Sequence, residues 1–242
     1  LVLGAGGAAR AVLAGLKGHS PESCPPDVLD QFAETKPRSI EVCGHSLALP
    51  EEAVVFDQVE ADKPFSNTLL FELLDLEGSV LFEKEYYSVG GGFLQVKGED
   101  LPARGRPRYP YADMAGLKHW LNEHGMRLHK LMLENERAIT GLPEREIWER
   151  LRNLTYVMEA SVESGLKATG VLPGAIGLQR KARAMMERYK ENPEANGSFM
   201  LALSAYAFAV SEENATGHRI VTAPTCGAAG VIPAVIQAMR VH

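Results

Sequence analysis

The chain has 242 residues, of which 45% are hydrophobic and 23% are charged, and its net charge at pH 7 is −6; this composition is typical of a globular protein with one large or two modest domains. The acidic balance argues against a nucleic-acid surface, three cysteines are too few for a disulfide framework, and no apolar run approaches the roughly 20 residues that span a bilayer. Because a signal-peptide pattern is also missing, we expect a cytoplasmic protein without nucleic-acid or membrane partners.

The first 16 residues, LVLGAGGAARAVLAGL, predict a strand, a glycine loop and a helix. The string GAGGAAR is similar to the NADP loop of shikimate dehydrogenases, so an NADP-dependent reductase is one alternative function. Three prolines in the string PESCPPD, at residues 21–27, interrupt the pattern that a dinucleotide-binding unit requires and weaken this hypothesis.

Short runs at residues 39–43 and 53–59 have strand character, and residues 68–75 with 79–88 predict a hairpin. The hairpin leads into three consecutive glycines at residues 90–92, which suit either a tight bend or a close approach to a ligand. Residues 95–111 are rich in proline, glycine and charge and predict a linker, so we place a domain boundary near residue 105.

The rest of the chain has helical periodicity. We predict helices over five ranges, which are 111–123, 128–140, 144–165, 180–190 and 196–210. One apolar stripe of the third helix predicts a core face, formed by Ile147, Trp148, Leu151, Leu154, Met158 and Val162. The last helix is apolar nearly all round, which predicts a central, buried element.

The string NATGHRIVTAPTCGAAGVIPA spans residues 214–234. It places the thiol of Cys226 and the hydroxyl of Thr225 just before an apolar helix. The amides of Gly227, Ala228 and Ala229 would be unpaired donors at the start of this helix, which favours bound anions and a thiolate. Gly227 and Gly230 would allow a ligand to approach the backbone. Alternatively, Cys226 is a small buried thiol.

These residues resemble the bacterial iron-sulfur L-serine dehydratases, also called L-serine ammonia-lyases. The resemblance is carried by five strings in the same order as in that family, which are YYSVGGGF, LMLENE, TGVLPG with QRKA, SEENATG and VTAPTCGAAGVIPAV. It implies conversion of L-serine to pyruvate and ammonia with a [4Fe-4S] cluster as Lewis acid, and Cys226 as one cluster ligand. Many members carry their cysteine three residues later, where this chain has Ala229, so the two interpretations of Cys226 stay open.

The resemblance also implies that further cysteine ligands lie beyond His242 and that an SSSHT-type motif precedes Leu1, so we expect a fragment truncated at both ends. Cys24 and Cys43 fall outside the family strings. For the substrate we expect contacts from Thr225, Gly227, Asn214 and Ser88. Asn214 could instead cap a helix, and Ser88 could serve only in strand pairing. Arg180 and Lys181 either face an anion or form a solvated surface. The general base stays unassigned.

We therefore predict an α+β protein with a mixed α/β domain at residues 1–105 and an all-helical catalytic domain at residues 106–242. The expected function is L-serine deamination, with L-serine as ligand and a homo-oligomer or partner subunit as the expected assembly. An alternative from another class is a catalytically incomplete subunit that needs a partner with the remaining cysteines.

Overall fold

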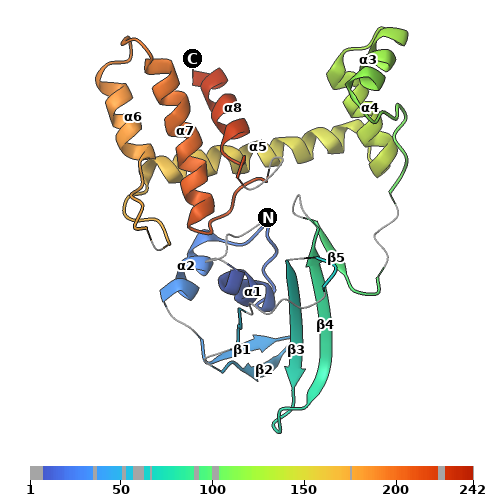
Figure 1. Cartoon of the computed structure of the whole chain (residues 1–242), viewed down its shortest axis with the longest axis vertical. Helices are drawn as coiled ribbons and strands as arrows, with labels where there is room; N and C mark the ends of the chain where they lie inside the picture. The colour runs from blue at the N-terminus through green and yellow to red at the C-terminus, as the bar shows by residue number, and fades with distance from the viewer. Residues whose placement is uncertain are drawn as a thin grey trace. The chain divides into compact units, whose positions relative to one another are not determined.

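The computed structural model describes residues 8–34, 37–50, 53–56, 63–65, 67–89, 93–99, 104–174, 176–222 and 227–241. Within these residues the strands lie in the N-terminal half, and the C-terminal half is helical, as Figure 1 shows. The predicted α+β class is confirmed. The chain divides into two compact units, one formed by Leu1–Lys97 with Val157–His242 and one by Gly98–Tyr156. The proposed boundary near residue 105 stays a prediction.

The N-terminal part begins with helix α1 (Ala8–Leu16), which the sequence predicts, and helix α2 (Pro26–Glu34), which it does not. Proline is favoured at the first helical position, because the N–H that it lacks has no partner there. Strands β1 (Ser39–Val42) and β2 (His45–Ala48) then form an antiparallel hairpin. In the described part, α1 is thus followed by a helix and an antiparallel pair, which gives no support to a dinucleotide-binding unit.

The β1–β2 turn consists of Cys43 and Gly44, both with positive φ angles of 51° and 81°. Such a two-residue turn matches the right-handed twist of an antiparallel hairpin. A small apolar core lies beneath the hairpin and the two helices, and its buried members are Leu13, Ala14, Cys24, Leu29, Phe32 and Ile40.

The second sheet has the order β3–β4–β5, with all pairs antiparallel. Strands β3 (Thr68–Leu74) and β4 (Val80–Ser88) form the predicted hairpin, whereas β5 (Leu94–Val96) overlaps the start of the linker that we predicted at residues 95–111. The strand predicted at residues 53–59 is wrong for the described residues 53–56, which form no strand. Residues 57–59 of that predicted strand and the three glycines at 90–92 lie outside the described residues.

The helices of the C-terminal half follow the predicted ranges closely. Their bounds are α3 Met114–Glu123, α4 Leu128–Thr140, α5 Glu144–Lys167, α6 Ala182–Glu191, α7 Ser198–Ala215 and α8 Val231–Val241. Helix α3 begins three residues later than predicted because the side chain of Asp113 caps it, accepting a hydrogen bond of 2.8 Å from the amide of Gly116.

The predicted core stripe of α5 is only partly buried. Ile147, Met158 and Val162 are buried, but Trp148, Leu151 and Leu154 are 45–47% exposed. The helix passes from one compact unit to the other at Tyr156. A local periodicity cannot show that a continuous helix leaves one core before it joins the next.

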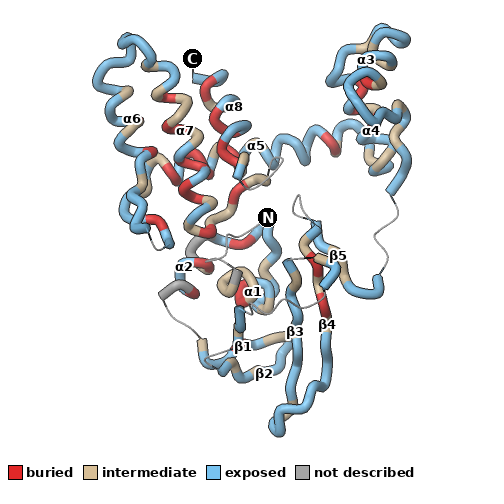
Figure 2. The backbone as a smooth tube through the Cα atoms, viewed as in Figure 1, coloured by how far each residue is buried: buried red, intermediate tan, exposed pale blue. Residues whose placement is uncertain are grey.

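Helix α7 packs between α6 and α8 (Figure 1) and supplies much of the helical core, whose buried positions are red in Figure 2. Two glycines permit this packing. A Cβ atom on Gly165 of α5 would collide with the backbone of Ala209, and one on Gly230 would collide with the backbone of Ala207. Gly230 therefore makes room for helix α7, and the approach of a ligand to its backbone stays a prediction. Phe199 and Met200 of α7 remain exposed, so its burial is not complete.

Candidate functional site

Two of the strings singled out in the sequence, QRKA and SEENATG, meet in the structure. Arg180 and Lys181 immediately precede helix α6, and helix α7 runs five residues beyond its predicted end, so that Glu212 and Glu213 lie in its last turns. Both glutamates are only 2% exposed. Buried carboxylates are rare unless they are paired, so their partners define the candidate site.

Arg180 is the buried cation of this site, with a side chain only 6% exposed. Its Nη1 donates to Glu213 Oε1 at 2.9 Å, and its Nη2 donates to Thr216 Oγ1 at 3.0 Å. Arg180 is therefore not part of a solvated surface but faces a glutamate of the same chain, and its contact with a bound anion stays a prediction. Lys181 instead places its Nζ 5.7 Å from the centre of the Phe208 ring.

Glu213 collects three donors. Besides Arg180, Ser164 Oγ donates to its Oε2 at 2.7 Å, and His218 Nδ1 lies 2.8 Å from the same oxygen. Burial raises the pKa of the Glu213 carboxyl, but the hydrogen bonds from His218, Ser164 and Arg180 outweigh burial, so that the net result is a lowered pKa. Glu213 is thus held as a carboxylate.

His218 contacts carboxylates with both ring nitrogens, because its Nε2 lies 3.1 Å from Asp30 Oδ1 on helix α2. The hydrogen bond with Glu213 raises the pKa of His218, burial opposes this effect, and Asp30 adds to it. An imidazole can donate from both nitrogens only when it is protonated. The two carboxylates therefore favour the protonated form of the ring.

Glu212 has a different role. Its Oε1 accepts hydrogen bonds from the amides of Lys181, at 2.6 Å, and Ala182, at 3.3 Å, and so caps the start of α6. Its Oε2 accepts no hydrogen bond from the described residues, and the nearest cation is Arg180 Nη1 at 4.0 Å. Taken together, the site fixes the ends of α6 and α7 with two carboxylates, one guanidinium and one imidazolium.

The predicted site residues lie elsewhere or outside the described part. Thr225 and Cys226 are among residues 223–226, whose structure is not described. Gly227 is exposed in a turn at residues 227–230, and α8 begins only at Val231, later than expected. The amide of Val231 donates to the carbonyl of Ala228. The predicted row of free amides at residues 227–229 therefore belongs to a turn rather than to the helix.

Ser88 occupies the strand position that we held as an alternative, but Asn214 is not a helix cap, because it lies inside α7 and the C-cap of that helix is Thr216. The carbonyl of Asn214, in the last turn of α7, accepts a hydrogen bond from the amide of Gly217 at 3.1 Å. Ser88 pairs with Leu94 of β5, and its amide donates to the carbonyl of Asn67 at 2.9 Å. A substrate contact by either residue stays a prediction.

The remaining cysteines stand apart. Cys24 is buried in the N-terminal core, where its Sγ lies 3.6 Å from the carbonyl of Pro25, and Cys43 is exposed in the β1–β2 turn. Across the described ranges, no three His, Cys, Asp or Glu side chains come together as metal ligands.

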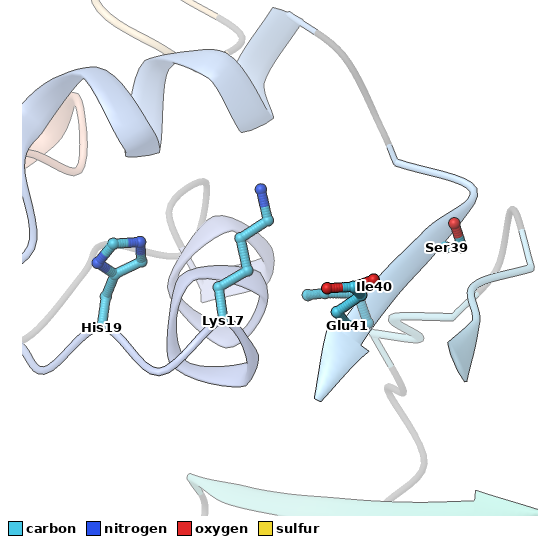
Figure 3. Close-up of a pocket in the computed structure, with 5 residues that line it drawn as sticks. All are labelled: Lys17, His19, Ser39, Ile40 and Glu41. Atoms are coloured by element: carbon cyan, nitrogen blue, oxygen red, sulfur yellow. The ribbon is translucent and has the colours of Figure 1, made fainter. Parts of the chain in front are cut away.

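A hollow of about 470 Å³ lies between the end of α1 and strand β1, lined by Lys17, His19, Ser39, Ile40 and Glu41 (Figure 3). Lys17 Nζ also lies 4.9 Å from the centre of the Phe32 ring. None of the five strings that carry the resemblance lines the hollow, whereas two of them meet in the Arg180–Glu213 network, so we assign the candidate site to that network.

The sequence reasoning missed Ser164, Glu212, Glu213 and His218. A signal was present, since two adjacent glutamates end a helix that is apolar nearly all round. His218 shows no metal-ligand spacing in the sequence, and spacing along the chain cannot reveal a histidine held between two carboxylates.

Comparisons with known proteins agree with the resemblance. A family model described as serine dehydratase beta chain matches residues 4–99, and one described as serine dehydratase alpha chain matches residues 123–242. The chain is 37% identical over 242 residues to an L-serine dehydratase of Streptomyces coelicolor, and the match covers 96% of this chain and 52% of that protein. An Escherichia coli protein named L-serine dehydratase 2 is 32% identical over 93% of this chain and 51% of its own length.

A Haemophilus influenzae L-serine dehydratase is 30% identical, over 93% of this chain and 51% of that protein. The chain thus spans about half the length of the curated relatives it matches. None of the described helices is both long and apolar enough to cross a membrane. Since the alpha-chain and beta-chain models match in succession over most of its length, the chain belongs to the serine dehydratase family.

Proposed function

We propose that this chain takes part in the conversion of L-serine to pyruvate and ammonia. The observation that carries the proposal is the match of both family models, in the order that the five strings predict, together with relatives named L-serine dehydratase over nearly the whole chain. Those relatives are about twice as long as this chain. That this chain takes part in the activity of a complete enzyme is therefore itself a proposal.

The reaction must remove the α-proton of serine and expel its β-hydroxyl, which is a poor leaving group. A [4Fe-4S] cluster, when bound, supplies a Lewis acid for that hydroxyl. The described residues do not offer a ligand set for it, because Cys24 lies in an apolar core and Cys43 lies in a separate hairpin turn. The role of Cys226 as one of its thiolate ligands rests on the family resemblance alone.

We further propose that Thr225 and the amide of Gly227 hold the substrate carboxylate, and that Asn214 and Ser88 contribute polar contacts. The exposure of Gly227 in the turn before α8 supports this proposal, since its backbone is open to a ligand. The Arg180–Glu213 network would act indirectly, because its charged groups are engaged with one another and hold the ends of α6 and α7 in place.

The test is anaerobic reconstitution of the chain with iron and sulfide, followed by visible absorption and a pyruvate assay with L-serine. Cys226→Ser is the diagnostic variant, and Cys43→Ser is the matched control, because Cys43 is an exposed thiol. We expect a cluster absorption band and pyruvate formation that Cys226→Ser abolishes and Cys43→Ser leaves unchanged.

Equal cluster content in both variants would overturn the assignment of Cys226. If the chain has no activity alone but forms pyruvate when combined with the remaining half of a family member, it is a catalytically incomplete subunit. If neither preparation deaminates serine, the proposed function is wrong.

A further inference from the structure

Residues 216–219, which follow helix α7, are held by the N-terminal part of the same compact unit. Arg10 Nη2, on α1, donates to the carbonyl of Thr216 at 3.0 Å. Asp30, on α2, lies 3.1 Å from His218 Nε2, and Arg219 Nη1 donates to the carbonyl of Glu22, between the two helices. The partners are 188 to 206 residues apart in sequence, so these contacts join opposite ends of the chain.

Three of these residues, Thr216, Gly217 and His218, are also held by the helical core. The amides of Thr216, Gly217 and His218 donate to carbonyls in the last turns of α7, at 3.0–3.1 Å. Thr216 Oγ1 accepts from Arg180, and His218 Nδ1 lies 2.8 Å from Glu213 Oε2. Of these contacts, only the His218 ring joins a residue of α2 directly to a buried carboxylate of α7.

We propose that His218 is a positioning residue whose imidazolium form locks residues 216–219 between helix α2 and the buried Glu213–Arg180 pair, and whose deprotonation loosens that segment. The proposal does not depend on serine being the substrate. A neutral imidazole has one N–H and can donate to only one of the two carboxylates. Loss of the proton to solvent therefore removes one of the two hydrogen bonds and the charge that attracts both partners.

The charged groups around the ring define the direction of the effect. Glu213 of α7 and Asp30 of α2 face the two nitrogens, and Thr216 Oγ1 lies 3.4 Å from Nδ1. Arg180 contacts the other carboxylate oxygen of Glu213, and Glu212 Oε2 lies 4.0 Å from Arg180 Nη1. Arg10 donates to the carbonyl of Thr216, and Arg219 donates to the carbonyl of Glu22. The contacts of the ring itself are thus with anions or a hydroxyl, which favours the protonated form.

The sign of the pH dependence follows from the raised pKa of His218. A group whose pKa is raised on folding contributes stability that is fully present below its unfolded value of 6.5 and is lost as the pH rises through the folded value. The segment should therefore be most protected under mildly acidic conditions and loosen toward alkaline pH.

The test is hydrogen exchange of the full chain, read as protection factors for the amides of Thr216, Gly217 and His218 after correction for the intrinsic pH dependence of exchange. The variants are His218→Gln, which cannot be protonated, and Asp30→Asn, which removes only the exposed partner. Glu41→Gln, which changes an exposed carboxylate on β1, is the matched control.

In the wild type, we expect protection of these amides to fall as the pH rises through the titration of His218. Asp30→Asn should lower protection about two- to fivefold at acidic pH, the size of an exposed ion pair, while Glu41→Gln should not. His218→Gln should remove the pH dependence. The proposal is overturned if wild-type protection is independent of pH, if His218→Gln keeps the same dependence, or if Asp30→Asn behaves like Glu41→Gln.

Discussion

Replacement of Arg180 by methionine tests whether the buried network stabilises the protein. The substitution keeps much of the apolar volume of the side chain but removes the guanidinium that donates to Glu213 and Thr216. Glu213, whose side chain is 3% exposed, would keep Ser164 and His218 as partners. Removal of one partner from a buried ion pair typically costs about 3–5 kcal/mol, because the other charge stays buried. Since His218 remains, we expect a loss of about 3 kcal/mol.

The assay is urea unfolding followed by far-UV circular dichroism. A loss of this size is a large part of the roughly 5–15 kcal/mol that stabilises a typical domain, so the midpoint should fall clearly. Arg145→Met is the matched control, because Arg145 donates to Glu149 on the surface of α5 with a side chain that is 90% exposed, and such a pair contributes little. If Arg180→Met unfolds at the same urea concentration as Arg145→Met, the network does not stabilise the fold and the reasoning is wrong.

Two further substitutions test the packing and the electrostatics. Gly165→Ala should destabilise the protein by about 1–3 kcal/mol in urea unfolding, because the added Cβ would collide with the backbone of Ala209. The control is Gly15→Ala in α1, where an added Cβ meets nothing within 4 Å. This variant should be neutral or more stable by up to about 1 kcal/mol. Hydrogen bonds from Lys97 and Lys63 lower the pKa of Glu85 from 4.5 to about 2, so its contribution is present above 4.5 and lost as the pH falls toward 2. Glu85→Gln should therefore weaken the dependence of the free energy of unfolding on pH over this range. Glu77→Gln, which changes an exposed carboxylate, should leave that dependence unchanged. Equal pH profiles of the two variants would contradict the stabilising role of the Glu85 ion pairs.

The helices of the C-terminal half could be predicted from sequence because their signals are local. Residues 128–140 carry an apolar period that coincides with α4, and the ends of α5 and α6 differ from the prediction by only a few residues. The hairpin of β3 and β4 was equally visible from its turn. Helix α2 and strands β2 and β5 were missed, since each is short and proline or glycine obscures its pattern.

The strings that mark the family are visible in the sequence alone, and the comparisons confirm the family that they indicate. The way in which these strings meet in space is not visible there. Arg180 and Glu213 are 33 residues apart, and His218 and Asp30 are 188 apart, so no periodicity predicts that they meet. Folding buries the side chains of Arg180 and Glu213, and only then does each of them require its partner. The sequence thus determined the helices and the family, whereas the tertiary structure decided which charges pair, because the cost of burying a charge exists only in the folded protein.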